Sequence, residues 1–205
     1  MTEPPFGALL CDIDGVLRHW PPLDEIERAA GLPVGAVAAV AFTPPLIDAA
    51  ITGRTTDAEW RAAIVAELAA AHGSADAAEA AVAGWSAVLP RVDHEVVALL
   101  TALRGVIPVA LVSNATTRLD EDLARIGLAD VADAIVNTSA LGVAKPDPRV
   151  YALAADRVGV PAARCLFVDD TEANVVAARA AGMTGVHFRT AADLRLALTG
   201  TSQPG

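Results

Sequence analysis

The second half of the chain alternates continuous apolar runs with segments of helical spacing, and this alternation constrains the fold more than any other feature. The apolar runs cover residues 106–112, 134–136, 165–168 and 185–188. The intervening segments predict helices over residues 119–126, 148–158 and 172–181. Strands that are buried on both faces read as unbroken apolar runs, and strands separated by helices pair in parallel. The pattern therefore predicts an α/β fold whose parallel sheet is covered by helices on both faces.

The first half begins with one further strand and continues as a helical insertion. An apolar run ends at Asp12 and Asp14, and helical spacing then predicts helices over residues 24–30, 44–51, 57–71 and 75–88. Thr56 and Glu59 have the spacing of a capping box. No strand is expected in this insertion, and a helix over residues 94–104 leads back to the sheet. We expect residues 1–15 and 91–205 to form the α/β core, and residues 16–90 to form an α-helical cap inserted after strand 1.

Composition excludes several classes of partner. With 205 residues and 54% hydrophobic content, the chain can bury one substantial core. The formal charge of −10 disfavours nucleic acids and anionic membranes, both of which attract basic surfaces. No secretion signal is recognisable at the start, so a cytoplasmic location is expected, with Cys11 and Cys165 as buried, reduced thiols. Disorder is expected only in the terminal segments, residues 1–5 and 199–205.

The paired carboxylates of Asp12 and Asp14 need a counter-charge. Like charges this close disfavour joint ionisation unless a cation or a shared proton offsets them. Mg²⁺ prefers oxygen ligands and is often held by one or two carboxylates together with a substrate phosphate. The alternative is a solvated junction between strand and turn, in which Gly15 supplies only a permissive backbone. The pair alone does not decide between these interpretations.

Polar groups also follow the next three predicted strands, beyond a short loop in the case of Lys145, and ligands of open parallel sheets bind outside the carboxyl ends of the strands. These groups are Ser113-Asn114, Lys145-Pro146 and Asp169-Asp170. Each pair has a structural alternative: Ser113, Asn114 and the two aspartates could cap helices or form turns, and Lys145 could be a solvated lysine. However, Lys145 lies next to the predicted helix N-terminus at Asp147-Pro148, and two positive features together favour an anion.

Taken in order, these motifs resemble the haloacid dehalogenase-like hydrolase superfamily over about residues 6–190. The first motif is the segment from Cys11 to Leu17, and the second is Val112-Ser113-Asn114-Ala115. The third contains Lys145-Pro146 with Tyr151 at a familiar offset. The fourth has the Asp-Asp-x-x-x-Asn form of phosphatase domains related to the amino-terminal domains of epoxide hydrolases. The resemblance implies a Rossmann-like parallel sheet and an inserted helical cap.

The resemblance also implies a mechanism, namely Mg²⁺-dependent hydrolysis of a small phosphate monoester. Asp12 would be the nucleophile that forms an aspartyl-phosphate, and Asp14 would be the acid and base. Ser113 and Lys145 would contact phosphoryl oxygens, with Asn114 beside them. The metal ligands would be Asp12, the Asp14 carbonyl and Asp170, with Asp169 as a ligand or as a partner of metal-bound water. Asn174 would order the metal-site loop.

Two positions depart from common forms of the family. Val16 stands where many members have threonine. Asp14 stands where the haloacid dehalogenases proper usually have an aromatic residue and need no metal, so Asp14 favours phosphoryl transfer. A phosphomutase, a haloacid dehalogenase-type hydrolase and a non-catalytic binding module remain the alternatives.

Substrate specificity is expected to lie in the cap, which would close over the site. Arg18, His19 and Trp20 follow the first motif and are candidates to line its entrance. The alternatives are an exposed loop position for His19 and packing at the core–cap junction for Trp20. Arg54 and Trp60 are weaker candidates. The expected partner is a small phosphorylated molecule, and the protein is expected to be a monomer or a small homo-oligomer.

Overall fold

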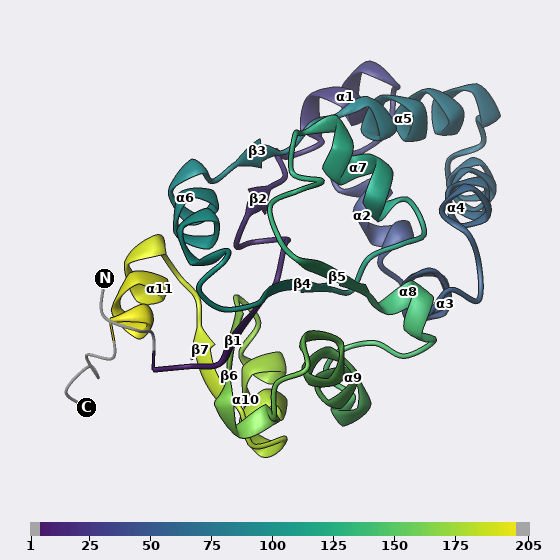
Figure 1. Cartoon of the computed structure of the whole chain (residues 1–205). Helices are drawn as coiled ribbons and strands as arrows, with labels where there is room; N and C mark the ends of the chain where they lie inside the picture. The colour runs from purple at the N-terminus through teal and green to yellow at the C-terminus, as the bar shows by residue number, and fades with distance from the viewer. Residues whose placement is uncertain (1–4, 200–205) are drawn as a thin grey trace.

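A parallel sheet forms the centre of the computed structural model, which describes residues 5–199 (Figure 1). Among these residues the sheet has five strands in the order β5-β4-β1-β6-β7, and every neighbouring pair is parallel. The strands are β1 (Ala8–Cys11), β4 (Val109–Ser113), β5 (Ala134–Asn137), β6 (Cys165–Asp169) and β7 (Thr184–His187). β1, β4 and β6 are buried along their whole length, as their apolar sequences predict. The predicted α/β fold is confirmed.

Two apolar clusters fill the spaces between the sheet and its covering helices. α6 (His94–Leu103), α7 (Leu119–Arg125) and α11 (Ala191–Leu198) pack on one face through residues such as Leu100, Leu123 and Leu194. α9 (Pro148–Val158) and α10 (Glu172–Ala180) pack on the other face, where the Tyr151 ring meets Phe167 edge-on at 5.2 Å. Each β–α crossover therefore places the carboxyl end of its strand at one common edge of the sheet.

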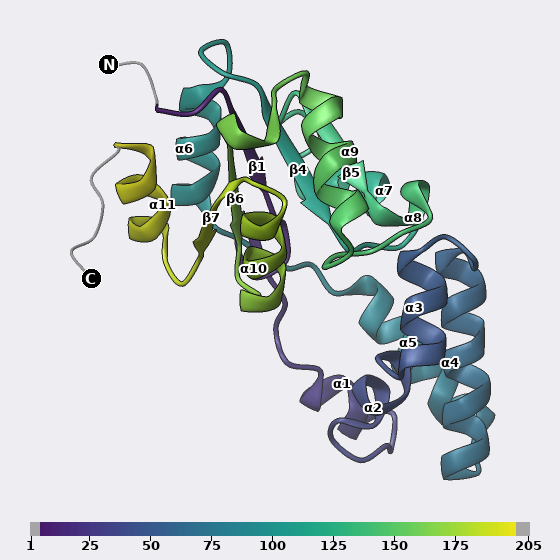
Figure 2. The same ribbon diagram turned by 90° about the horizontal axis from the view of Figure 1, so that it is seen from below.

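The helices between residues 19 and 91 form a separate lobe, which we call the cap (Figure 2). The cap helices are α1 (Asp24–Ala29), α2 (Ala36–Ala41), α3 (Pro44–Ile51), α4 (Asp57–His72) and α5 (Ala75–Ala87). The cap has its own apolar core, which includes Val37, Ile64 and Leu68. The predicted capping box is present at the start of α4, because Thr56 and Glu59 each accept a backbone N–H from the other.

The expectation of an insertion without strands is wrong at its first residues. β2 (Arg18–His19) pairs with β3 (Arg91–Val92) in an antiparallel two-stranded sheet. Two residues on each side are too few for a sequence period to appear, and the partners lie more than 70 positions apart. The pairing brings the two ends of the insertion together at the border between the core and the cap.

Helix α2 was also not predicted, and its N-terminus explains why. It begins after Gly35, whose φ is +85°, and its N-cap residue provides no side-chain cap. Instead, the carboxylate of Glu27, from α1, accepts hydrogen bonds from the backbone N–H groups of Gly35 at 2.6 Å and Val37 at 2.8 Å. A cap that arrives from another helix leaves no local start signal in the sequence.

Smaller differences concern element ends. β4 begins at Val109 because the backbone N–H groups of Val106 and Ile107 close the turn after α6 by bonding to Leu103. The short helices α8 (Thr138–Leu141) and η1 (Ala162–Arg164), together with α11, were not predicted.

Apart from Pro5 and Thr199, the terminal segments predicted to be disordered lie outside the described residues. Cys11 and Cys165 are free and buried. Across residues 5–199, no helix is long and apolar enough to cross a membrane.

Candidate active site

The carboxyl ends of β1, β4 and β6, which are neighbours in the sheet, bring the predicted motifs together. Asp12 follows β1, and its backbone N–H bonds to the Val168 carbonyl of β6 at 2.9 Å. Ser113 ends β4 and Asp169 ends β6, and both side chains are buried. We call this group the sheet-edge site; it consists of Asp12, Asp14, Ser113, Lys145, Asp169 and Asp170.

Lys145 lies at the centre of the sheet-edge site. Its Nζ atom is 2.8 Å from Asp12 Oδ1 and 2.7 Å from Asp169 Oδ2, and it donates to the Val112 carbonyl at 2.9 Å. All three donor positions of the ammonium group are thus occupied in a buried environment. One buried cation joins the ends of three neighbouring strands.

Burial and charge act in opposite directions on these groups. Burial disfavours the charged form of Lys145, but the carboxylates of Asp12 and Asp169 outweigh it, so the pKa of Lys145 is raised. The pKa of Asp12 is raised by burial, which the attraction of Lys145 offsets only in part, and the charge of Asp169 adds to the increase. Two buried carboxylates thus share the single ammonium group of Lys145.

Asn114 fixes the position of Lys145. Its side-chain amide donates to the Lys145 carbonyl at 2.9 Å, and its Oδ1 accepts the Lys145 backbone N–H at 2.8 Å. Asn114 therefore does not act as a helix cap, because α7 begins only at Leu119. Asp147 caps α9 by accepting the Arg149 backbone N–H, and Pro148 occupies the first turn, as the sequence predicts.

Asp169 is held from several sides. Asn174 donates to both of its oxygens, at 3.0 and 3.1 Å, and the Thr171 backbone N–H bonds to Oδ1 at 2.8 Å. Tyr151 in turn donates its hydroxyl to the Asn174 carbonyl at 2.9 Å. With Lys145 on its second oxygen, Asp169 has its acceptor positions filled by protein groups, so it is better suited to orient Lys145 than to bind a metal directly.

Asp12, Asp169 and Asp170 have the chemistry of a hard-cation site. One oxygen from each carboxylate lies within 4.8 Å of the others, and oxygen donors are the ligands that Mg²⁺ takes. Burial raises the pKa of Asp170, and the negative charge of the neighbouring Asp169 adds to the increase. Gly15 leaves room for this group: it has a φ of +81°, and a Cβ there would lie 1.9 Å from Asp170 Oδ2. The residues present fit a divalent cation, with Asp12 and Asp170 as the accessible ligands.

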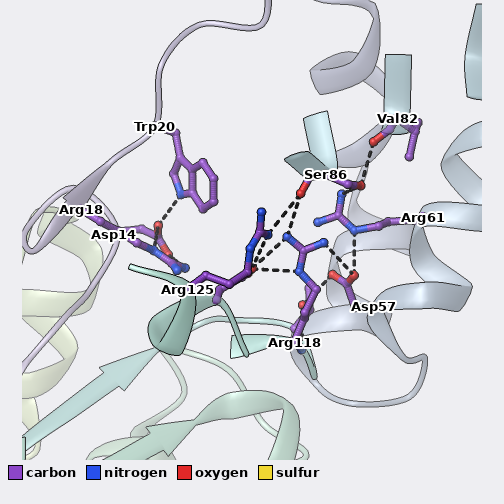
Figure 3. A network of polar contacts seen from close by, with 11 residues as sticks. Asp14, Arg18, Trp20, Asp57, Arg61, Val82, Ser86, Arg118 and Arg125 are labelled. Atoms are coloured by element: carbon purple, nitrogen blue, oxygen red, sulfur yellow. Dashed lines mark hydrogen bonds and ion pairs between the residues drawn. The ribbon is translucent and has the colours of Figure 1, made fainter. Parts of the chain in front are cut away.

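Asp14 is held by Arg18 and Trp20 rather than by Lys145 (Figure 3). Arg18 binds it with two nitrogens, Nε to Oδ1 at 2.9 Å and Nη2 to Oδ2 at 3.1 Å, and the Trp20 indole donates to Oδ1 at 2.6 Å. The Arg18 guanidinium also lies 5.1 Å from the centre of the Trp20 ring. The two carboxylates of the first motif therefore occupy different environments, one buried beside Lys145 and one at the border with the cap.

A second polar network, which was not predicted, joins the cap to α7 (Figure 3). Asp57, at the start of α4, accepts from Thr116 at 2.8 Å and from Arg61 at 2.7 Å. Arg118 and Arg125 both donate to the Ser86 carbonyl of α5 at 3.3 Å. The partners are separated by 32 to 59 positions along the chain, so no local pattern could have predicted the contact.

The candidate cap residues fall in different places. Trp20 and Trp60 line a cleft between the cap and the sheet-edge site, together with Arg18. His19 lies outside that lining, in β2, with its Nε2 3.9 Å from the Asp93 carboxylate. Phe42 and Trp85 also line the cleft but were not among the predicted residues, because only the packing of α2, α4 and α5 brings them together.

Fold and site together define an α/β enzyme core with an acidic, lysine-containing site under a helical lobe. The profile of haloacid dehalogenase-like hydrolases matches residues 6–182. The chain therefore belongs to the haloacid dehalogenase-like hydrolase family, and the predicted relationship is confirmed.

Relatives within the family differ in activity. Fructose-1-phosphate phosphatase YqaB of Escherichia coli is 33% identical over 102 residues, which are 49% of this chain and 52% of that protein. The first curated relatives, all phosphatases, are matched over 24% to 52% of their own length. A family enzyme from Bacteroides thetaiotaomicron, solved with magnesium and inorganic phosphate, has a TM-score of 0.68 at 20% identity, covering 87% of this chain and 92% of that one. An L-2-haloacid dehalogenase from Xanthobacter autotrophicus has a TM-score of 0.61 at 23% identity, covering 97% and 85%. At these identities the structural neighbours show the fold alone.

Proposed function

We propose that this protein is a Mg²⁺-dependent phosphatase that hydrolyses small phosphate monoesters through an aspartyl-phosphate on Asp12. The observation that carries the proposal is the position of Lys145, whose ammonium group lies 2.8 Å from Asp12 within a cluster of three carboxylates. Phosphoryl transfer depends mainly on positioning and on neutralising charge, and this cluster offers both. The named phosphatases among the relatives and the magnesium and phosphate of the Bacteroides enzyme support the same reaction.

In this proposal Asp12 attacks phosphorus, and the bond to the leaving alcohol breaks as the new bond to Asp12 Oδ forms. Lys145 orients Asp12 and neutralises a phosphoryl oxygen, and Ser113 donates a hydrogen bond to another. Asp14, as the carboxylic acid, gives its proton to the departing alcohol oxygen; the resulting carboxylate then takes a proton from the water that attacks phosphorus, and the bond between Asp12 and phosphorus breaks to release phosphate. For both steps the Asp14 carboxyl group turns from Arg18 and Trp20 toward the scissile oxygen.

The residues proposed to hold Mg²⁺ are Asp12, the main-chain carbonyl of Asp14, and Asp170. Bound there, the metal would lower the repulsion between the Asp12 carboxylate and an anionic phosphate. Asp169, whose oxygens bind Lys145, Asn174 and the Thr171 N–H, is assigned to positioning rather than to direct ligation.

The test is hydrolysis of 4-nitrophenyl phosphate with Mg²⁺ by the wild type and by Asp12→Asn. We expect the variant to lose at least about 10³-fold in kcat, since it lacks the nucleophile. Asp156→Asn, at an exposed position of α9 outside the cleft lining, serves as the control and retains activity. Equal rates for the wild type and Asp12→Asn would refute the nucleophile, and activity that survives thorough chelation would refute the metal.

Dehalogenation is the second candidate, because two kinds of neighbour, phosphatases and a haloacid dehalogenase, share the fold. The carboxylate at Asp14 argues against it. Release of chloride from 2-chloropropionate without Mg²⁺, together with no hydrolysis of phosphate esters, would reverse the order of the two candidates.

A further inference from the structure

From the cleft between the cap and the sheet-edge site we infer the substrate class: a phosphate monoester of an uncharged alcohol that carries a flat apolar ring. This inference rests on the proposed phosphatase function. It concerns the leaving group, which is the alcohol released when the P–O bond breaks. The cleft, which we call the cap cleft, has a volume of about 570 Å³. That size lies within the roughly 300–1,000 Å³ of pockets that hold drug-sized ligands.

The cap cleft begins where the leaving group would be. Asp14, the proposed acid, and Asn114, which positions Lys145, both belong to its lining. From there it extends between the cap helices and the N-terminal end of α7, where Thr116 and Leu119 contribute. An alcohol that takes its proton from Asp14 therefore projects into this space and contacts the cap.

Aromatic rings form much of the cap side. Phe42, Trp60 and Trp85 make a cluster in which each ring meets the next at a steep angle, with centres 5.4 to 6.5 Å apart. Trp60 is buried, whereas Phe42 is 57% exposed although it belongs to this cluster. With Trp20 at the opposite border, all three tryptophans of the chain line the cleft. A ring that remains exposed inside a concave, aromatic surface indicates a contact with an apolar ligand.

The charges of the cleft exclude a second anionic group on the substrate. Each arginine of the lining is already paired with a carboxylate: Arg18 with Asp14 at 2.9 Å, Arg61 with Asp57 at 2.7 Å, and Arg118 with Asp122 at 2.9 Å. Asp24 and Glu27 add further negative charge to the lining. Within the described residues the lining carries five carboxyl groups and three guanidinium groups, so a carboxylate or second phosphate on the substrate would meet net repulsion even when Asp14 has turned from Arg18, whose Nη1 has no partner.

The paired arginines also favour a ring. The Arg61 guanidinium lies 4.6 Å from the centre of the Trp85 ring and 5.8 Å from that of Trp60. Asp57 and Ser86 hold it there at 2.7 Å each. Flat groups thus stack along one wall of the cleft, and a flat substrate ring extends this stacking at little cost in conformational entropy.

The experiment compares 2-phenylethyl phosphate with glycerol 3-phosphate, which both release a primary alcohol and so have P–O bonds of similar reactivity. The wild type, Phe42→Ala and, as a control, Leu153→Ala are assayed; Leu153 is an exposed apolar residue of α9 outside the cleft. We expect Phe42→Ala to lower kcat/KM for the phenylethyl ester by roughly tenfold and to leave the glycerol ester unchanged. Leu153→Ala should change neither value.

A binding measurement separates this inference from the proposed function. Because all three tryptophans line the cleft, 2-phenylethanol should change the intrinsic fluorescence in a saturable way, and glycerol should not. Saturable binding with no hydrolysis of either ester would support the apolar cleft and refute the phosphatase. Two outcomes would overturn the inferred substrate class and leave the phosphatase intact. In the first, both esters are hydrolysed and Phe42→Ala loses kcat/KM equally for both. In the second, both esters are hydrolysed but 2-phenylethanol does not change the fluorescence.

Discussion

The sheet-edge site and the cap cleft share Asp14 and have opposite chemistry. At the sheet edge, buried charged groups are fixed by other charged groups, and Lys145 alone contacts two carboxylates within 2.8 Å. In the cap cleft, aromatic rings carry the contacts, and the charged side chains are paired with one another at its border with α7. The difference indicates that the two regions suit different parts of a substrate. The sheet edge is suited to a phosphoryl group, and the cap cleft is suited to the group bonded to that phosphoryl group.

The largest expected effect comes from removing the cation of the sheet edge. Lys145→Ala leaves Asp12 and Asp169 buried without their counter-charge, which should cost about 3–5 kcal/mol in the free energy of unfolding. Urea denaturation measures the change. Arg149→Ala, which removes an ion pair whose arginine side chain is 72% exposed, is the control and should have little effect. Equal losses in the two variants would mean that the sheet edge does not depend on Lys145.

The contact between the cap and the core can be broken at Gly53. This residue has a φ of +68°, and a Cβ there would lie 2.0 Å from the Ser139 carbonyl oxygen of α8. Gly53→Ala should therefore destabilise the protein by about 3 kcal/mol, from the left-handed conformation and from the clash with backbone. Gly73→Ala is the matched control, because its φ is +76° and no atom lies within 4 Å of the added Cβ.

In thermal or urea denaturation the difference between Gly53→Ala and Gly73→Ala isolates the contact of the cap with the core. If both variants lose the same stability, the cap does not need this close approach. If only Gly53→Ala raises KM for a phosphate ester, the placement of the cap also matters for substrate binding.

Gly15→Ala tests the sheet-edge site in the same way, and its expected loss of stability is smaller. The conformation should cost about 1–2 kcal/mol, and the added methyl group meets the end of a side chain, Asp170, that can rotate away. Rotation should weaken Mg²⁺ binding, which titration of Mg²⁺ in the phosphatase assay would detect. Gly105→Ala, with a φ of +79° and open space around it, should lose similar stability and keep the Mg²⁺ dependence of the wild type. A Mg²⁺ dependence unchanged in Gly15→Ala would argue against Asp170 as a ligand.

The smallest expected effect is at Asp147, which caps α9 just beyond Lys145. Hydrogen bonds from Arg149 hold the pKa of Asp147 down at about 2. A carboxyl whose pKa is lower in the folded state stabilises the protein above its unfolded pKa, and this contribution disappears as pH falls toward 2. Asp147→Asn should therefore be less stable than the wild type at pH 7 and approach it in acid. A stability difference independent of pH would contradict the assignment.

The two regions also differ in how far the sequence predicts them. Asp12 and Asp169 were predictable because each lies at the end of an apolar strand, and parallel strands end at the same edge; Lys145 was predictable from its place in the loop that follows another such strand. The role of Asn114 was not, since it bonds to the backbone of a residue 31 positions away. The cap helices α4 and α5 were predicted from their spacing, and α4 also from its capping box.

The arrangement of those helices was not predictable, because it depends on contacts between distant segments. Phe42 and Trp85 read as ordinary apolar residues until α2 and α5 bring them to the same wall of the cleft. Likewise, α2 depends on a cap from the carboxylate of Glu27, and Asp57 accepts a hydrogen bond from Thr116, 59 positions away; no local pattern marks either partner.

The β2–β3 pairing makes the cap an exchangeable module. His19 and Arg91 are register partners, so the chain leaves the core and returns to it at points about 5 Å apart. A two-residue turn could close that gap in place of everything between the two strands. Among the described residues, no strand of the central sheet comes from the insertion. One catalytic core of this kind can therefore carry different lobes, and a new substrate specificity can arise when one lobe replaces another while the sheet stays the same.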